Sequence, residues 1–393
     1  MAELPRRIYL DHAATSWPKP DAVYAAVDRY QRELGAPSGR GAYAEAVQAS
    51  QMVESARRAV AAFLQAEDAR RIVFTFNGTD SLNLALHGSL DAAGGHVVTT
   101  AVEHNSVLRP LRTLVDAGRI EVSQVACDAL GVVDPDDIRR ALRPDTKLVA
   151  LAHASNVTGA LQPVSEVGRI AREHGALYLV DAAQSLGEIP LSVQELQADL
   201  LAAPGHKGLL GPLGTGVLYI RPGVERRLAS LRQGGTGSHS EDDRQPDQLP
   251  DKYESGNLNV GGIAGLAAGI QWLNERGLAE VRRHAVKLTE RLMAGLAAID
   301  GARLFGPPAG GRVAVVSMTL EGLDCQELAA SLDSAYRIQT RPGLHCAPAM
   351  HRALGTLESG GTVRFSMGAT TTAEEVDSAI EAVRAISSAV LNN

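Results

Sequence analysis

Two charged side chains of types suited to chemistry follow apolar, β-rich runs of the sequence. Asp181 ends the run 177–181, and Lys207 lies in the turn Pro204-Gly-His-Lys-Gly208, directly after the run 199–203. A lysine beside a histidine in a Pro/Gly turn at a strand end is poorly explained as a solvated surface charge. It can form a Schiff base, provided that its environment lowers its pKa enough to free the amine.

The spacing of these groups brings them to one edge of a sheet. Lys207 and Asp181 are 207 − 181 = 26 positions apart, about one strand–helix–strand crossover. The predicted strand 72–76 runs into Asn77-Gly-Thr79, where the glycine allows a tight turn, Thr79 suits a helix N-cap and the first helical amides bind a phosphate. Each feature alone has a structural explanation. Together, a carboxylate for a pyridinium nitrogen, a lysine for an aldehyde and a helix N-terminus for a phosphate indicate a site for pyridoxal phosphate.

The elements that position these side chains follow from the pattern of apolar residues. Between about residues 70 and 220, short β-rich runs alternate with stretches long enough for a helix. Because several runs are continuously apolar, the pattern is typical of a mostly parallel sheet covered on both faces. An Ala-rich stretch at 44–64 predicts a long helix before the first strand. The predicted strands are 72–76, 96–100, 147–151, 177–181, 199–203 and 216–220.

A second, smaller unit follows a loop. Residues 234–262 are rich in Gly, Ser, Asp and Asn, which predicts a passage between domains. We expect an α/β protein with a large domain of residues 21–260 and a small α+β domain of residues 1–20 and 261–393, which carries the Cys346 loop. In the small domain the sequence predicts a helix at 265–276, strands at 313–320 and 362–366, and a closing helix at 372–391.

Composition excludes several classes of protein. The chain has 393 residues with 38 Lys and Arg against 45 Asp and Glu, a net charge of −7, whereas nucleic acids and anionic membranes reward a basic face. We therefore predict no nucleic-acid partner and no membrane partner. The first residues contain no apolar signal region, and there is no uncharged apolar run of 18 or more residues, so we expect a cytoplasmic protein.

Any cysteine chemistry must belong to a single thiol. Cys127, Cys325 and Cys346 are too few and too scattered for a disulfide framework, and without a CxxC pair we predict no metal site. A free thiol, with a pKa of roughly 8.5, needs cationic or polar help to act as a nucleophile. Arg341 and His345 are close to Cys346 in sequence, and flanking Gly and Pro residues predict a loop on which the thiol could swing. The other two cysteines are expected to be structural.

With these motifs in order, the sequence resembles the class V, fold-type I enzymes that depend on pyridoxal phosphate, and among them the cysteine desulfurase and selenocysteine lyase group. The resemblance covers almost the whole chain and implies a seven-stranded sheet in the large domain. The motifs that carry it are Tyr9-Leu-Asp-His-Ala-Ala14, Asn77-Gly-Thr79, Glu103-His104-Asn105, Ser155-Asn156-Val-Thr-Gly159, Asp181-Ala-Ala-Gln-Ser185, Pro204-Gly-His-Lys207, Arg341-Pro-Gly-Leu-His-Cys346 and Val363-Arg-Phe-Ser366.

The resemblance implies a role for each cofactor-binding residue. Lys207 would bind pyridoxal phosphate covalently, and Asp181 would pair with the pyridinium nitrogen, which keeps the ring an electron sink. Gln184 would donate a hydrogen bond to the phenolic oxygen, and His104 would stack on the ring and shuttle protons. The phosphate would be held by Asn77, Gly78, Thr79 and His206.

The resemblance also implies a substrate and an assembly. Asn156 and Arg364 would bind the α-carboxylate of L-cysteine, with Arg341 as a further substrate-binding residue. Gly235 and Thr236 would reach the phosphate of a neighbouring subunit, which implies a homodimer.

The context of Cys346 resembles the short-loop desulfurases. It implies that L-cysteine becomes L-alanine while Cys346 takes the sulfur as a persulfide, for a sulfur-acceptor protein and iron–sulfur cluster assembly. Three residues depart from the pattern: Leu344 stands where these enzymes commonly have His, Pro342 stiffens the approach to the loop, and Asn257 replaces a usual Thr.

Other functions remain open at this stage. The same cofactor site would serve a class V aminotransferase, an epimerase, a selenocysteine lyase or a β-lyase in which Cys346 is not the nucleophile. A catalytically weak sulfur-transfer partner in iron–sulfur assembly is a third possibility. A Cys-His thiol hydrolase is disfavoured because it leaves Lys207, Asp181 and Thr79 without a role.

Overall fold

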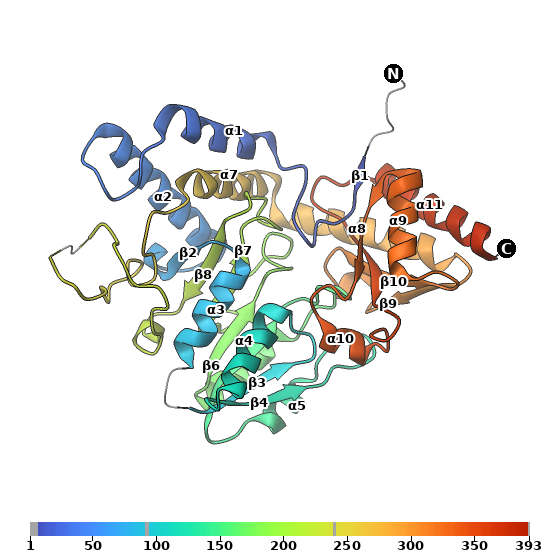
Figure 1. Ribbon diagram of the computed structural model, residues 1–393, viewed down its shortest axis with the longest axis horizontal. Helices are drawn as coiled ribbons and strands as arrows, with labels where there is room; N and C mark the ends of the chain where they lie inside the picture. Colours follow the sequence, from blue (N-terminus) through green and yellow to red (C-terminus); the bar gives the residue numbers. More distant parts are fainter. Residues whose placement is uncertain (1–6, 91–93, 239–240, 392–393) are drawn as a thin grey trace.

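The computed structural model describes residues 7–90, 94–238 and 241–391. Residues 1–6, which begin the predicted small-domain segment 1–20, lie outside this description. The chain forms a larger and a smaller unit, with the orange and red C-terminal elements of the smaller unit at the right of Figure 1. In the described ranges, no helix has both the length and the apolar character that a membrane crossing requires.

The larger unit is built on a seven-stranded sheet. The strands β3, β4, β5, β6 and β7 run parallel, and β8 is antiparallel to its neighbours β7 and β2. The strands β6, β7 and β8 are buried along their whole length because helices cover both faces of the sheet. The spatial order is β2 (Ile72–Thr75), β8 (Gly216–Ile220), β7 (Leu200–Pro204), β6 (Leu177–Asp181), β5 (Thr146–Ala152), β3 (His96–Thr100) and β4 (Glu121–Val125).

Helices form a layer on each face of this sheet. On one face, α2 (Ala44–Phe63), α6 (Val164–His174) and α7 (Val260–Arg276) share an apolar core with the strands. On the other face, α3 (Gly78–Ser89) and α4 (Asn105–Asp116) form a second core and lie in front of the sheet in Figure 1. The remaining helical segments of this unit are α1 (Asp21–Arg29), η1 (Tyr30–Leu34), η2 (Ala69–Arg71), α5 (Pro135–Ala141) and η3 (Val224–Arg226).

The smaller unit packs helices on a four-stranded antiparallel sheet, with a separate apolar core. Its strand order is β12 (Arg341–Gly343), β13 (Thr362–Ser366), β10 (Val315–Leu320) and β9 (Ala302–Phe305). The first strand of the chain, β1 (Ile8–Tyr9), pairs in parallel with β11 (Ile338–Gln339). The helical segments are α8 (Leu278–Ala297), η4 (Ala309–Gly311), α9 (Cys325–Tyr336), α10 (Pro348–Ala353) and α11 (Ala373–Leu391). The predicted domain boundary between 260 and 261 stays a prediction.

The sequence predicted most of the large sheet. All six predicted strands are confirmed to within one residue at each end, whereas β4 was missed because its Glu-Val-Ser-Gln-Val sequence has the polar composition of an exposed edge strand. The N-cap prediction for α3 is wrong, because the Asn77 side chain, not Thr79, caps this helix by accepting from the Asp80 amide at 2.9 Å. The predicted loop 234–262 ends early, because the Asn259 side chain caps α7.

A buried ion pair holds the long return segment 221–259 against the sheet. The Arg57 guanidinium of α2 donates to both carboxylate oxygens of Glu254, at 2.7 and 2.8 Å. The amide of Phe74 in β2 donates to the same carboxylate at 2.6 Å, and the guanidinium lies 4.8 Å from the centre of the Phe74 ring. Three separate parts of the chain therefore meet at one carboxylate.

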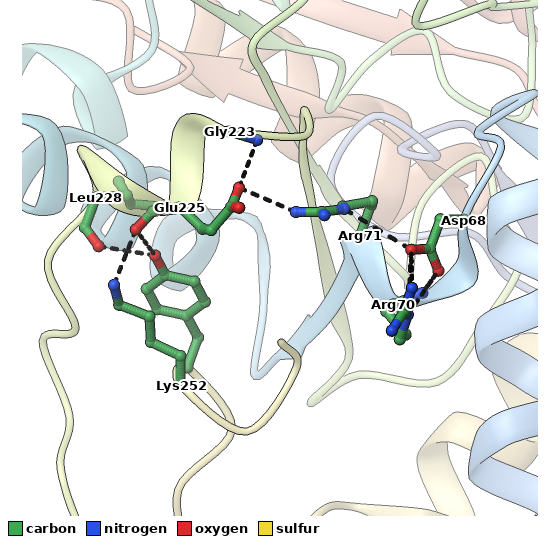
Figure 2. Close-up of polar contacts among 8 residues, drawn as sticks. Asp68, Arg70, Arg71, Gly223, Glu225, Leu228 and Lys252 are labelled. Carbon is green, nitrogen blue, oxygen red and sulfur yellow. Dashed lines mark hydrogen bonds and ion pairs between the residues drawn. The ribbon is translucent and has the colours of Figure 1, made fainter. Parts of the chain in front are cut away.

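A second polar network lies near this ion pair, toward the surface. Figure 2 shows Arg71 donating to the Glu225 carboxylate at 2.9 Å, while Lys252 donates to the Glu225 carbonyl at 2.8 Å. The carboxylate also accepts from the amide of Gly223 at 2.7 Å. This network joins η3 to the start of β2 and to the residues that precede Glu254.

We predict that Glu254→Ala lowers the stability of the protein by about 3–5 kcal/mol, because it removes the buried carboxylate that pairs with Arg57 and leaves this buried guanidinium only the half-exposed Glu54 carboxylate, at 3.1 Å. The measurement is the shift of the thermal and urea unfolding midpoints. The control is Glu33→Ala, which breaks the solvent-exposed pair with Arg29 and is expected to cost less than about 1 kcal/mol. Equal losses in the two variants would show that the buried pair has no special role.

Candidate active site

A cavity of about 580 Å³ lies at the carboxyl ends of β6 and β7, beside the start of α3. These strands are parallel neighbours, with Asp181 opposite Ala202, so Asp181 and the turn after β7 meet at one sheet edge. Most of the site residues predicted from the sequence meet here. Those that line the cavity are Asn77, Gly78, Thr79, His104, Asn156, Asp181, Gln184, His206 and Lys207.

The environment of Lys207 favours the neutral form of its amine. Protein surrounds its side chain, and this burial lowers its pKa to about 8, an effect that the positive charge of Arg364 strengthens and the Asp181 carboxylate opposes. A lysine with such a pKa has a substantial free-amine fraction near neutral pH, which attack on an aldehyde requires.

A carboxylate and an amide face the same cavity. Asp181 is buried, and its Oδ1 accepts a hydrogen bond from the Ala183 amide at 2.9 Å. Burial raises the pKa of this carboxyl group, so a cationic ring nitrogen in the cavity would stabilise its ionised form. The Gln184 amide donates to the carbonyl of Ala13 at 3.1 Å, which orients the side chain. Its second N–H can serve a ligand oxygen.

The start of α3 provides an anion-binding end. A Cβ atom at Gly78 would lie 3.0 Å from the Pro204 ring, so glycine lets the helix begin close against the turn after β7. The Thr79 hydroxyl lies 2.8 Å from that of Ser106, and the buried Nδ1 of His206 has no partner in the described structure. Helix amides, a hydroxyl and an unpaired imidazole nitrogen suit a phosphate. With Lys207 and Asp181, this donor set fits pyridoxal phosphate.

His104 is held as a neutral imidazole. Its Nδ1 accepts a hydrogen bond from the Ser106 amide at 3.0 Å, capping α4. Since an amide can only donate, the single ring proton is on Nε2. Burial lowers the pKa of His104 to about 4, and the nearby charges of Lys207 and Arg341 act in the same direction. The ring therefore presents an N–H at neutral pH.

The two predicted carboxylate-binding residues lie together. Arg364 in β13 is buried and donates from Nη1 to the carbonyl of Asn156 at 3.1 Å. Its Nη2 donates to Oδ1 of Asp11 at 2.7 Å, in an ion pair that the sequence analysis did not anticipate. Arg364 Nε and Asn156 Oδ1 are both buried without a described partner. The pair thus retains polar groups that a substrate could engage.

Cys346 lies in the turn between β12 and α10, with Arg341 as its cationic neighbour. The guanidinium Nη2 of Arg341 is 3.5 Å from the Cys346 sulfur. The second group expected to help the thiol, His345, does not supply a cation. Its buried imidazole lies 3.0 Å from the Thr362 hydroxyl, and burial, reinforced by the charge of Arg364, lowers its pKa to about 2.

The backbone that carries this thiol is strained and held at several points. His345 and Cys346 have φ values of 49° and 60°, a left-handed conformation that costs non-glycine residues on the order of 1–3 kcal/mol each. The carbonyl of His345 accepts from Asn156 Nδ2 at 2.5 Å, and that of Cys346 accepts from the Asn105 amide at 2.7 Å. Groups of the larger unit therefore hold the turn of the smaller one.

Some predicted residues are not brought to the cavity. The Gly235 carbonyl accepts from Arg40 at 2.7 Å, and the Thr236 hydroxyl lies 3.0 Å from that of Ser238, both away from the cavity lining. Asn257 is exposed and does not line the cavity.

The two remaining cysteines have packing contacts. Cys127 lies 3.8 Å from the sulfur of Met350, and Cys325 is buried with its sulfur 3.5 Å from the Gly360 carbonyl. Neither lines the cavity.

Sequence reasoning missed three supporting residues: Asp11, Ser106 and Thr362. Each lies within or directly beside a quoted motif, which is the only local signal for it. Asp11 and Arg364 are 353 positions apart, so nothing in the local sequence connects them.

The sequence and the fold are both similar to those of known proteins. The sequence matches the family described as Aminotransferase class-V over residues 8–378. A "Probable cysteine desulfurase" of Methanothermobacter thermautotrophicus is 40% identical over 371 residues, covering 94% of this chain and 92% of the relative. A "Probable cysteine desulfurase" of Pyrococcus abyssi is 37% identical over 380 residues, covering 94% and 92%. The apo structure of a cysteine desulfurase from Thermococcus onnurineus superposes with a TM-score of 0.90 at 35% identity, covering 98% of this chain and 95% of that chain.

These matches extend over nearly the whole chain and both units. The chain belongs to the class-V aminotransferase family, as the motifs had indicated. The named relatives and the solved structure place it, within that family, beside the cysteine desulfurases. The predicted α/β fold of fold-type I is thereby confirmed.

We predict that Thr362→Val loosens the Cys346 turn, because it removes the partner of the buried His345 imidazole at a cost of about 1–3 kcal/mol. Alkylation of Cys346 by iodoacetamide, followed by peptide mass spectrometry, is expected to become several-fold faster. Thr362→Ser keeps the hydroxyl and should restore the wild-type rate. Thr289→Val removes a buried hydroxyl that bonds only within α8 and should leave alkylation unchanged. A wild-type alkylation rate in Thr362→Val would refute the anchoring role.

Proposed function

We propose that this protein is a pyridoxal-phosphate-dependent cysteine desulfurase, which converts L-cysteine to L-alanine and leaves the sulfur on Cys346 as a persulfide. The observation that carries the proposal is the position of Cys346. Its sulfur lies 3.5 Å from a guanidinium, in a turn whose carbonyl groups contact Asn156 and the start of α4 at the Lys207 cavity. A thiol in this position has no role in an aminotransferase or an epimerase.

Different residues of the cavity would hold different groups of the cofactor. Lys207 would attach it, Asp181 would pair with the ring nitrogen, and Gln184 would donate to the phenolic oxygen. Thr79, His206 and the first amides of α3 would hold the phosphate. When bound, the cofactor supplies an electron sink that makes carbanion chemistry at the substrate feasible.

The protein's own groups then account for the remaining steps. Arg364 and Asn156 bind the substrate carboxylate, and Lys207 Nζ takes up the Cα proton. The Cys346 thiolate attacks the substrate sulfur, so that the Sγ–S bond forms and the S–Cβ bond breaks. The electron pair of the broken bond stays with Cβ, which gains a proton and becomes the methyl group, and Lys207 returns a proton to Cα to complete alanine. His104 Nε2–H is the neutral donor placed to exchange protons in this cavity.

The assembly and cellular role extend this proposal. We propose a homodimer, because the resemblance assigns Gly235 and Thr236 to the phosphate of a neighbouring subunit and these residues lie outside the cavity lining of their own chain. We further propose that the sulfur passes to an acceptor in iron–sulfur cluster assembly and that the protein works in the cytoplasm.

We predict that Cys346→Ser abolishes sulfur removal without abolishing substrate binding, because serine keeps the size of the side chain but is a poor nucleophile toward sulfur. L-cysteine should still change the absorbance spectrum of the holoenzyme. Alanine formation should fall by at least about a hundredfold, the scale for loss of a covalent nucleophile.

Cys127→Ser and Cys325→Ser are matched controls and should retain turnover within a few fold. Release of alanine by Cys346→Ser at the wild-type rate, with a reductant present to accept sulfur, would replace this proposal with a lyase in which the thiol has no role. The assay uses cysteine rather than selenocysteine, because selenium can leave without a thiol nucleophile.

The pKa of Lys207 gives a pH prediction. Only the neutral amine attacks an aldehyde, and the pKa of about 8 means that protonation progressively slows the attack as the pH falls below this value. The rate at which the apoenzyme binds pyridoxal phosphate covalently should therefore rise with pH up to about 8 and then level off. Following the absorbance change between pH 6 and pH 10 tests this. A rate that still climbs at pH 10, as for an ordinary lysine, would contradict it.

A further inference from the structure

A second concave site lies next to the cofactor cavity. A groove of about 430 Å³ runs between α3, which contributes Asn83 and His87, and α4, which contributes Arg109 and Thr113. Cys346 lines this groove and is not among the residues that line the cavity around Lys207. We call this site the acceptor groove. Cys346 therefore lines a space that adjoins the cofactor cavity, with which it shares Thr79, His104 and Ser106.

The charge of the acceptor groove is positive. Its lining contains one guanidinium, from Arg109, and two histidines, but no carboxylate. Burial lowers the pKa of both His87 and His104, so the two rings are neutral near pH 7. Arg109 is exposed, and within the described ranges no carboxylate pairs with it. The positive charge of Arg109 also acts on His104, another residue of the lining, because it contributes to the lowered pKa of that ring.

We propose that the acceptor groove binds the compound that takes the sulfur from Cys346, and that it favours a small thiol carrying a carboxylate. This inference rests on the proposed function, since it requires a persulfide on Cys346. The volume suits a small molecule. An unpaired guanidinium in a site without carboxylates attracts both the attacking thiolate and a carboxylate on the same compound.

The transfer step balances without an added oxidant or reductant. The thiolate of the acceptor attacks the outer sulfur of the Cys346 persulfide. An S–S bond forms between the acceptor and that sulfur, and the bond between the outer sulfur and Sγ breaks. Cys346 leaves as a thiolate, and the acceptor becomes a persulfide, so one S–S bond replaces another.

The test separates the transfer from the formation of the persulfide. The holoenzyme is treated with L-cysteine, freed of small molecules and mixed at low salt with 3-mercaptopropionate, 2-mercaptoethanol or cysteamine, which are anionic, neutral and cationic. Mass spectrometry follows the loss of the extra sulfur from Cys346. Arg109→Gln should reduce the rate ratio of the anionic to the cationic thiol about fivefold. Persulfide formation should stay within about twofold of wild type.

Matched variants exclude a general charge effect. Arg109→Lys keeps the positive charge and should keep most of the preference for the anionic thiol. High salt should weaken this preference in the wild type. Arg112→Gln removes a charge from the same helix, but Arg112 pairs with Asp116 and does not line the groove, so its ratio should match wild type. Comparing ratios between variants cancels the different intrinsic reactivities of the three thiols.

The outcomes are distinct. If the ratio of the transfer rates to the anionic and cationic thiols is unchanged in Arg109→Gln, or falls equally in Arg112→Gln, the proposed role of the acceptor groove is wrong. The desulfurase proposal is then unaffected. Negligible transfer to all three thiols, with a stable persulfide, overturns the small-thiol assignment in favour of a protein acceptor. Failure of cysteine to generate any persulfide overturns the proposed function together with this inference.

Discussion

A lysine amine enclosed by protein at the edge of a parallel sheet is the constraint around which the molecule is arranged. Placing Lys207 near the guanidinium of Arg364 makes its protonated form costly, and Asp181 compensates only in part. The free amine that results is what covalent chemistry with an aldehyde needs. Adjacent strands β6 and β7 bring the carboxylate and the lysine turn to the same edge, so the proximity of Asp181 to Lys207 follows directly from the strand order.

The smaller unit completes this site with charged groups and with the Cys346 thiol. The strands β12 and β13 pair so that Arg341 stands opposite Arg364, which concentrates positive charge where an amino-acid carboxylate and a thiolate would lie. Asp11, from the first segment of the chain, offsets part of that charge. The N-terminal segment therefore has an electrostatic role as well as a structural one.

The Cys346 turn shows how a strained backbone conformation can be maintained in the folded protein. Two consecutive left-handed residues persist because Asn156 and Asn105 bind their carbonyl groups, while Thr362 binds the His345 ring. Cys346 lines the acceptor groove, while the carbonyl of the neighbouring His345 accepts from Asn156, which lines the cofactor cavity. The turn therefore lies between the two spaces.

The sequence by itself predicted six of the seven strands of the large sheet and most of the residues that line the cavity, because continuous apolar runs and the residues that end them are local patterns. It failed where polarity or geometry is not local. The half-polar strand β4 has no strong apolar pattern of its own. The N-cap of α3 is Asn77 and not the predicted Thr79, because the backbone geometry selects the residue that caps the helix. Only the tertiary structure decided that Arg341 rather than His345 stands beside Cys346 as the cation, and that Asp11 pairs with Arg364. The physical reason is that neither contact is local in the sequence. The direction of a side chain in the left-handed turn depends on the groups of the larger unit that hold the turn, and the Asp11–Arg364 contact depends on how the two ends of the chain pack within the smaller unit.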